Sequence, residues 1–216
     1  MTALAATQIA GFTAEQIRAL TPEQIQVMDT AQLCALAPAQ LAALTTTAIE
    51  GMTGGQLSAL NATQLKSLGG AALSALSAAQ FSALTTTQLS MLTATQMQGM
   101  TSTDVNELTA EQLSAFTPAQ LTALTASAVG GLRPEHMAAL TATQLKGLSD
   151  AFIANLDTTQ LAALTNAQVG SLTTTAMRGL GSAQMAALST TQLSGLSPTQ
   201  IASLTTAQLS GLTVDQ

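Results

Sequence analysis

The chain of 216 residues has no tryptophan and no tyrosine, and it contains only four phenylalanines. It also has one cysteine, Cys34, and one histidine, His136. So few aromatic side chains provide no row on which bases or sugars could stack. A single cysteine forms no disulfide within the chain, and one Cys with one His is too small a ligand set for a zinc site. We therefore expect no metal and no cofactor.

Charge is equally scarce, because only 7% of the residues are charged and the formal net charge is −6. A nucleic-acid partner would need clustered basic residues, and we expect none here because the five basic residues are scattered. No apolar run approaches the ~18 residues of a membrane helix, so we expect no membrane insertion. The opening MTALAATQ shows no basic segment followed by a long apolar core, so no secretory signal peptide is visible. The basic residues are Arg18, Lys66, Arg133, Lys146 and Arg178.

What fills the chain is an eight-residue unit, of which residues 117–124 (TPAQLTAL) are a clean copy. Residues 5–212 hold 26 complete octads (208 residues divided by 8) without insertion or deletion. Position 1 is Thr, Ser, Asp or Asn in 21 octads, and position 4 is Gln in 19. Positions 5 and 8 are always apolar, position 7 is Ala, Gly or Ser in 22 octads, and all five prolines occupy position 2.

These preferences predict that every octad starts its own helix. A Thr or Ser followed three residues later by Gln is a capping box, in which each side chain bonds the other residue's backbone N–H. Proline is tolerated at the first helical position, which is position 2 here. The helix can then run from about position 2 to about position 8, or about two turns.

The octads predict an all-α solenoid rather than one long helix or a sheet. In a continuous helix, eight residues leave about 80° of drift per octad, so positions 5 and 8 would spiral around it. In a strand, those positions would point to opposite faces. Two-turn helices are unstable alone and must support one another. Most octads without Gln at position 4 form two groups with a spacing of three octads, which would suit about three helices per superhelical turn, although His136 lies outside this pattern. The first group is Ala48 and Ala72, and the second is Asp104, Ala128, Phe152 and Ala176.

The uninterrupted phase predicts one continuous repeat domain over residues 1–216. The array is already in phase at Leu4 and stops halfway through an octad at Gln216. Solenoids usually carry polar capping repeats. We therefore expect this chain to be a segment of a longer array.

Candidate chemical groups are few, and each has a structural alternative. His136 occupies the Gln position of its octad, so random divergence of the repeat sequence explains it better than a Ser–His–Asp triad does. Cys34 lies at the variable position 6. Asp104 with Glu107, and Asp150 with Asp157, are sparse carboxylates that fit a solvated face better than a calcium site. We expect no catalytic residue and no enzyme.

Threonines supply the one pattern that suggests a working surface. In several octads both position 1 and position 3 are Thr, and stacking could align them into uncharged rows resembling those of ice-binding proteins. The alternative is that position 1 is a cap and position 3 is a small polar filler, which Glu15 and Glu23 would interrupt. The candidate rows comprise Thr45, Thr47, Thr85, Thr87, Thr93, Thr95, Thr101, Thr103, Thr141, Thr143, Thr173 and Thr175.

The consensus TxxQLxxL over residues 5–212 resembles the Thr-, Ala- and Leu-rich octapeptide arrays of large bacterial secreted or cell-surface proteins. The resemblance implies an extracellular or cell-surface location and a role as a structural spacer or scaffold, which could be adhesive or self-associating. We take this as the expected function. An ice-binding protein that uses the Thr rows is the alternative.

Overall fold

The computed structural model describes residues 1–216, and it contains 26 short helices and no strand. The chain divides into two compact units, Met1–Leu108 and Thr109–Gln216, each with 13 helices. The first unit contains α1 (Ala6–Ala10), α2 (Ala14–Arg18), α3 (Pro22–Gln26), α4 (Thr30–Cys34), α5 (Pro38–Leu41), α6 (Thr46–Glu50), α7 (Gly54–Ala59), α8 (Ala62–Ser67), α9 (Gly70–Ser74), α10 (Ala78–Ser82), α11 (Thr86–Ser90), α12 (Ala94–Gln98) and α13 (Ser102–Glu107). The second contains α14 (Ala110–Ser114), α15 (Pro118–Ala123), α16 (Ala126–Val129), α17 (Pro134–Ala139), α18 (Ala142–Lys146), α19 (Asp150–Ala154), α20 (Thr158–Ala162), α21 (Asn166–Gly170), α22 (Thr174–Met177), α23 (Ser182–Ala187), α24 (Thr190–Ser194), α25 (Pro198–Ala202) and α26 (Thr206–Leu209).

Each helix begins where the octad predicts, and in most octads a capping box forms at that start. In α11, the backbone N–H of Gln88 donates to the hydroxyl of Thr85 at 3.2 Å. The backbone N–H of Thr85 donates to Gln88 Oε1 at 3.0 Å in return. Thr85 itself is extended, with φ −70° and ψ 155°. The two bonds satisfy backbone donors that a helix start leaves without partners.

The helices are shorter than the expected two turns, because they contain four to six residues. They end at position 5, 6 or 7, where the backbone tightens before the next cap. In the octad of α11, the N–H of Leu92 donates to the carbonyl of Leu89, three residues back, at 3.2 Å. That spacing is a 3₁₀-type bond, which commonly closes a helix C-terminus.

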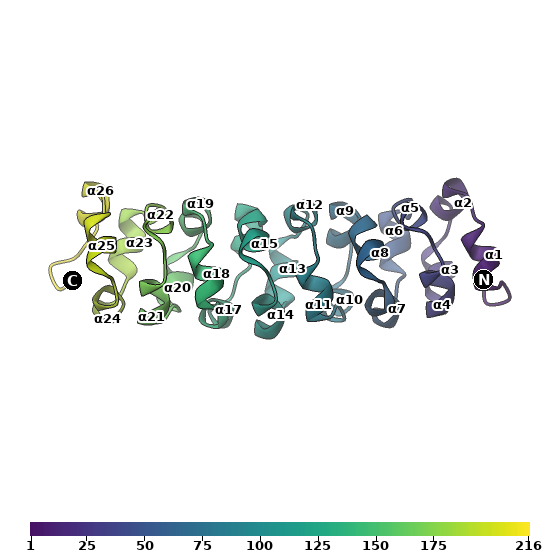
Figure 1. Ribbon diagram of the computed structural model, residues 1–216, viewed down its shortest axis with the longest axis horizontal. Helices are drawn as coiled ribbons and strands as arrows, with labels where there is room; N and C mark the ends of the chain where they lie inside the picture. The colour runs from purple at the N-terminus through teal and green to yellow at the C-terminus, as the bar shows by residue number, and fades with distance from the viewer. The chain divides into compact units, whose positions relative to one another are not determined.

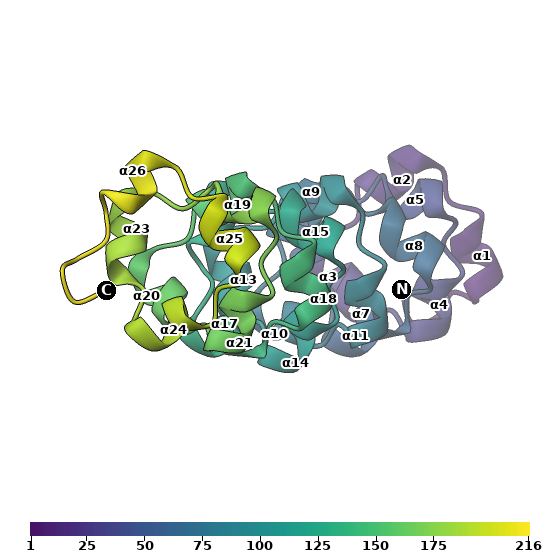
Figure 2. The same ribbon diagram turned by 60° about the vertical axis from the view of Figure 1, so that its left-hand side comes forward.

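Helices three apart in sequence pack on each other within each unit. In the first unit α1 contacts α4, α4 contacts α7 and α7 contacts α10, and in the second α20 contacts α23 and α23 contacts α26. One turn therefore holds about three octads, as the spacing of octads without Gln predicts. Figures 1 and 2 both show α21 beside α24. The structure confirms an all-helical repeat solenoid, while the single continuous domain remains a prediction.

Positions 5 and 8 form the core. Position 5 is buried in every octad from Ile9 to Met185, and position 8 in every octad from Met28 to Leu188. Each buried side chain of this size contributes about 2 kcal/mol by leaving water. Within each unit the core thus consists of the two apolar residues that each octad contributes, and an isolated octad could not form it.

Candidate functional site

The repeated glutamine at position 4 has a second role that the capping box does not include. Gln96 is 1% exposed, and its Oε1 accepts the N–H of Thr93 at 2.9 Å. Its Nε2 donates to the carbonyl oxygens of Leu65 at 2.8 Å and Leu68 at 2.7 Å. Those two residues are 31 and 28 positions earlier; Leu65 lies within α8, and Leu68 follows its end. Because α9 is the helix on which α12 packs, the side chain fastens one turn to the turn before it.

The same arrangement recurs in both units. Gln56 donates to Ile25 and Met28, both at 2.8 Å. Gln160 donates to Val129 at 2.9 Å and Leu132 at 2.8 Å. We call these bonds the glutamine ladder. They occupy the amide groups that would otherwise be available for binding a ligand.

His136 takes the place of a ladder glutamine and is 0% exposed. Its Nδ1 accepts the backbone N–H of Arg133 at 3.1 Å, as a glutamine Oε1 would. Its Nε2 lies 3.1 Å from a guanidinium nitrogen of Arg133, and Arg133 also pairs with Glu135 at 2.9 Å. A side chain buried in this way does not reach a substrate in solvent. His136 therefore occupies the structural position of a ladder glutamine.

Three of the four candidate carboxylates accept backbone N–H groups of their own octads. Asp104 Oδ2 accepts the N–H of Thr101 at 2.7 Å, and Asp157 Oδ1 accepts the N–H of Gln160 at 2.7 Å. Asp150 Oδ1 accepts the N–H of the adjacent Ala151 at 2.8 Å. No group of three or more His, Cys, Asp or Glu side chains is arranged to hold a metal ion.

Cys34 is half-buried, and its thiol donates to the carbonyl of Ala59 at 3.3 Å. Burial raises the pKa of this thiol above its ordinary value. A raised pKa lowers the fraction of the reactive thiolate at neutral pH. The environment therefore does not activate this cysteine as a nucleophile.

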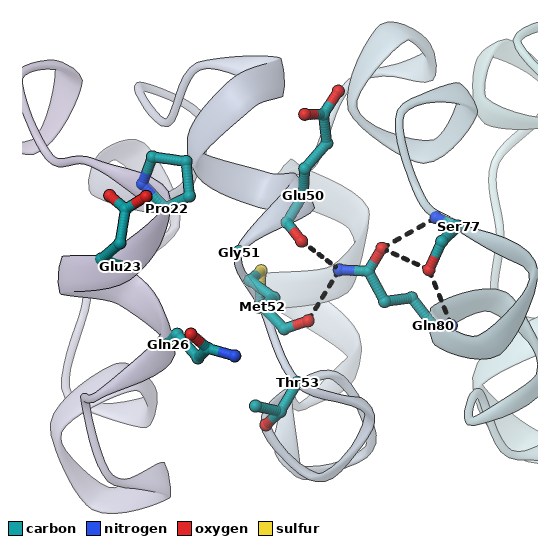
Figure 3. Close-up of a pocket in the computed structure, with 9 residues that line it drawn as sticks. All are labelled: Pro22, Glu23, Gln26, Glu50, Gly51, Met52, Thr53, Ser77 and Gln80. Carbon is teal, nitrogen blue, oxygen red and sulfur yellow. Dashed lines mark hydrogen bonds between the residues drawn. The ribbon is translucent and has the colours of Figure 1, made fainter.

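The first unit has a hollow of about 380 Å³, between α3, α6 and the start of α10. Pro22, Glu23, Glu50 and Gln80 lie around it (Figure 3). The amide of Gln80 is already bonded, since Nε2 donates to the carbonyls of Ile49, Glu50 and Met52 at 3.0, 3.1 and 2.6 Å. The pKa of Glu23 is lowered, first by a backbone hydrogen bond and then by the Thr21 hydroxyl. The hollow thus has two carboxylates, on α3 and α6, beside an amide that is already bonded.

The Thr candidates separate into two groups. The hydroxyls at position 1 are used as caps: Thr45 accepts the N–H of Ala48 at 3.1 Å, and Thr93 accepts that of Gln96 at 3.2 Å. The position 1 residues are half-buried or exposed, whereas all six position 3 residues are exposed. Equivalent positions of packed helices are three octads apart, but no two of the six Thr pairs have that spacing. The position 1 and 3 pairs considered are 45 and 47, 85 and 87, 93 and 95, 101 and 103, 141 and 143, and 173 and 175.

Replacing Thr45 and Thr47 one at a time separates these two roles. We expect Thr45→Ala to lower the free energy of unfolding by about 1 kcal/mol, because α6 loses its cap. We expect Thr47→Ala to change it by less than about 0.5 kcal/mol, as is usual for an exposed side chain. Urea unfolding followed by circular dichroism measures both. Equal losses would show that position 3 contributes as much as the cap.

Membrane insertion finds no support, because the longest helices have six residues, far too few to cross a lipid bilayer. Among known families, the ALTTAQ repeat matches residues 25–62 and residues 166–197 of the chain. No curated protein matches the chain. The family match therefore supports the repeat array that the octads and the glutamine ladder describe, and within those two segments the chain is similar to the ALTTAQ repeat.

Proposed function

We propose that this chain is a non-enzymatic structural scaffold or spacer segment of a bacterial surface or secreted protein, with an adhesive or self-associating capacity. The glutamine ladder is the observation that carries the proposal. Glutamine at position 4 is the most frequent buried polar side chain, and its amide could otherwise help to form a binding site. Instead it joins one turn to the next, as Gln96 does through the carbonyls of Leu65 and Leu68.

The repeat design also favours a spacer because one turn can replace another. Stability in such arrays is close to a sum of contributions from neighbouring repeats. The two side chains that could take part in a reaction are His136, which is buried, and Cys34, which is bonded within the chain. A function that depends on length and surface, and not on a particular residue, fits these features.

Deletion of whole turns tests the spacer role in cells that produce the protein. Residues 53–76 and residues 77–100 are each one turn of three octads in the first unit. We expect either deletion to leave a folded chain and to weaken cell attachment equally. An antibody against the chain should also label intact cells or the growth medium. Loss of attachment with only one of the two deletions would indicate a local site, and labelling only after lysis would contradict the proposed location.

The alternative is an ice-binding surface, which the exposed threonines at position 3 favour. Against it, the pairs at Thr45 and Thr93 are separated by an intervening turn that carries Gly69 and Ala71 at the equivalent positions. Thermal hysteresis and ice-crystal shape of the purified, folded chain distinguish the two functions. Faceted crystals with a freezing gap would support the alternative, and unaltered ice would support the scaffold.

A further inference from the structure

The octad of residues 69–76, which contains α9, begins without a capping box. Its cap position is Gly69 and its ladder position is Ala72. Gly69 has no side chain to accept a backbone N–H, and Ala72 has no oxygen to accept the N–H of Gly69. No acceptor in the chain reaches that N–H. α9 therefore starts with neither half of the arrangement that begins the other helices.

No other helix of the chain has lost both halves. α1, α5, α17 and α23 also lack a side-chain cap, but in each of them the position 4 residue accepts the N–H of the cap residue. α6, α16, α19 and α22 lack Gln at position 4, but a Thr or Ser hydroxyl caps each of them. Gly181 is the nearest parallel to Gly69, and its N–H donates to Gln184 Oε1 at 2.7 Å.

The ladder bond from this octad to the turn before it is also missing. A glutamine at residue 72 would reach the carbonyls of Leu41 and Leu44, which are 31 and 28 residues earlier, as the partners of Gln96 are. Ala72 has no amide to make these bonds. No donor in the chain reaches the carbonyl of Leu44. At this corner the turn of α9 is not fastened to the preceding turn.

The ladder bond that should come from the following turn is missing as well. The same separations place its donor at residue 104, with the carbonyls of Leu73 and Leu76 as partners. Asp104 occupies that position, and its Oδ2 accepts the N–H and the hydroxyl of Thr101 at 2.7 and 2.9 Å. An ionised carboxylate has acceptors only, and no donor in the chain reaches the carbonyl of Leu76. The octad of α9 thus has no ladder bond in either direction.

Hydrogen bonds hold the residues on both sides of this octad. The carbonyl of Leu68 accepts Gln96 Nε2 at 2.7 Å, and the N–H of Ser77 donates to Gln80 Oε1 at 2.7 Å. The octads before and after it stay bonded to earlier turns through Gln64 and Gln80. The stretch without such bonds is therefore limited to residues 69–76.

Two apolar side chains hold α9 in place. Leu73 is 0% exposed and Leu76 is 4% exposed. α9 lies beside α12 (Figure 1), but the close contact between them is made by backbones, since a Cβ on Gly70 would lie 2.9 Å from the carbonyl oxygen of Thr95. Glycine at the start of a helix also loses more backbone entropy on folding than alanine does. Burial of two leucines must therefore offset this cost without help from a cap or the ladder.

We propose that residues 69–76 open as a local unit, and that α9 is the interior helix at which the first unit yields first. Local opening involves the segments with the fewest stabilising interactions, while neighbours that remain bonded limit its extent. Opening exposes Leu73 and Leu76 and leaves Leu68 and Ser77 in place. The array can then yield at one octad without unfolding as a whole. The proposal does not depend on the spacer role, which the deletion series decides separately.

Hydrogen exchange of the whole native chain, followed by NMR, tests local opening. The N–H of Leu73 donates to the carbonyl of Gly69 at 3.2 Å, and the N–H of Leu65, one octad earlier, donates to that of Asn61 at 2.9 Å. Both leucines are 0% exposed. We expect the Leu73 amide to exchange at least about tenfold faster, which corresponds to about 1.4 kcal/mol. Low concentrations of urea should change its rate little, because local opening exposes little surface. Equal protection of the two amides would overturn the proposal.

Restoring the missing amide tests the cause. Ala72→Gln supplies an acceptor for the N–H of Gly69 and donors for the carbonyls of the preceding turn. We expect it to slow exchange at Leu73 at least about tenfold relative to the native chain. Ala71→Gln is the matched control, because it adds the same side chain to the same helix at an exposed position 3, and it should leave the rate unchanged. No slowing with Ala72→Gln, or equal slowing with both variants, would overturn the proposal.

Restoring the whole capping box gives the strongest form of the test. A Cβ on Gly69 would meet nothing within 4 Å, so Gly69→Thr adds a cap without a clash. We expect Gly69→Thr/Ala72→Gln to bring the exchange rate of Leu73 to that of Leu65. Gly181→Thr adds a cap in the second unit, where Gln184 already bonds, and should leave Leu73 unchanged. Circular dichroism confirms that each variant is folded. A double variant whose Leu73 still exchanges faster than Leu65 would show that the missing bonds are not the cause.

Discussion

Replacing Gln96 with alanine should lower the free energy of unfolding by about 3 kcal/mol, because the backbone groups that its amide bonds would lose their hydrogen-bond partner. The amide is 1% exposed and joins the cap of its own helix to two carbonyls of the preceding turn. Alanine would leave the carbonyls of Leu65 and Leu68 and the N–H of Thr93 without this partner. A buried polar group without a partner costs about 1–3 kcal/mol. Urea unfolding followed by circular dichroism gives the difference.

Gln8→Ala is the matched control because Gln8 makes only the cap bond and is exposed. We expect a loss of about 0.5 kcal/mol, which is the low end for a cap interaction. The difference between the variants isolates the bonds to the preceding turn. If Gln96→Ala cost no more than Gln8→Ala, the ladder would contribute nothing to stability, and the basis of the scaffold proposal would fail.

The natural octads that lack glutamine show how the array accommodates such losses. Ala48 and Ala72 occupy the ladder position in α6 and α9, and both are buried. Their neighbours Gln56, Gln64 and Gln80 keep the bonds to earlier turns. Because the contributions of neighbouring repeats add, the solenoid tolerates a missing bond in one octad when the adjacent octads retain theirs.

Most of the fold could be predicted from the octad because its information is local. Thr85 and Gln88 form the cap that the spacing requires, and the recurrence of Ala48 and Ala72 at three octads predicts the packing of helices three apart. The helix ends were less predictable. The tightening at Leu92 depends on the start of the next cap, and it shortens each helix below two turns.

The second role of glutamine was missed although the sequence contains a signal for it. A capping box accepts Glu as readily as Gln, yet none of the 26 octads has Glu at position 4, while Glu15, Glu23 and Glu111 occur at position 3. Unlike a carboxylate, an amide has both an acceptor for the cap and donors for carbonyls. The partners could not be predicted, because their separation of 31 and 28 residues follows from the stacking of turns.

The alignment of the candidate threonines is the feature that the sequence predicts least well. Whether threonines such as Thr47 and Thr95 form a row depends on which helices pack together. Helices three octads apart pack on each other, whereas those two threonines are six octads apart. Ala71 occupies the equivalent position on the turn between them. The sequence contains the residues, but their alignment is a property of the superhelix.

Glycine at position 7 sets how closely turns approach, and replacing Gly51 should have the second large effect. A Cβ there would lie 2.3 Å from the carbonyl oxygen of Pro22 and 2.5 Å from its Cα. Both are backbone atoms, so α3 and α6 would have to separate. We expect Gly51→Ala to lower the free energy of unfolding by about 2 kcal/mol, within the usual range for overpacking.

The same substitution four residues later should act in the opposite direction. A Cβ on Gly55 would meet nothing within 4 Å, and Gly55 lies inside α7, where alanine loses less backbone entropy on folding. We expect Gly55→Ala to raise the free energy of unfolding by about 0.5–1 kcal/mol. Because both variants add one methyl group to the same unit, propensity alone predicts the same sign for both. Opposite signs would show that the approach of α6 to α3 requires Gly51, whereas two stabilised variants would mean that the turns separate at little cost.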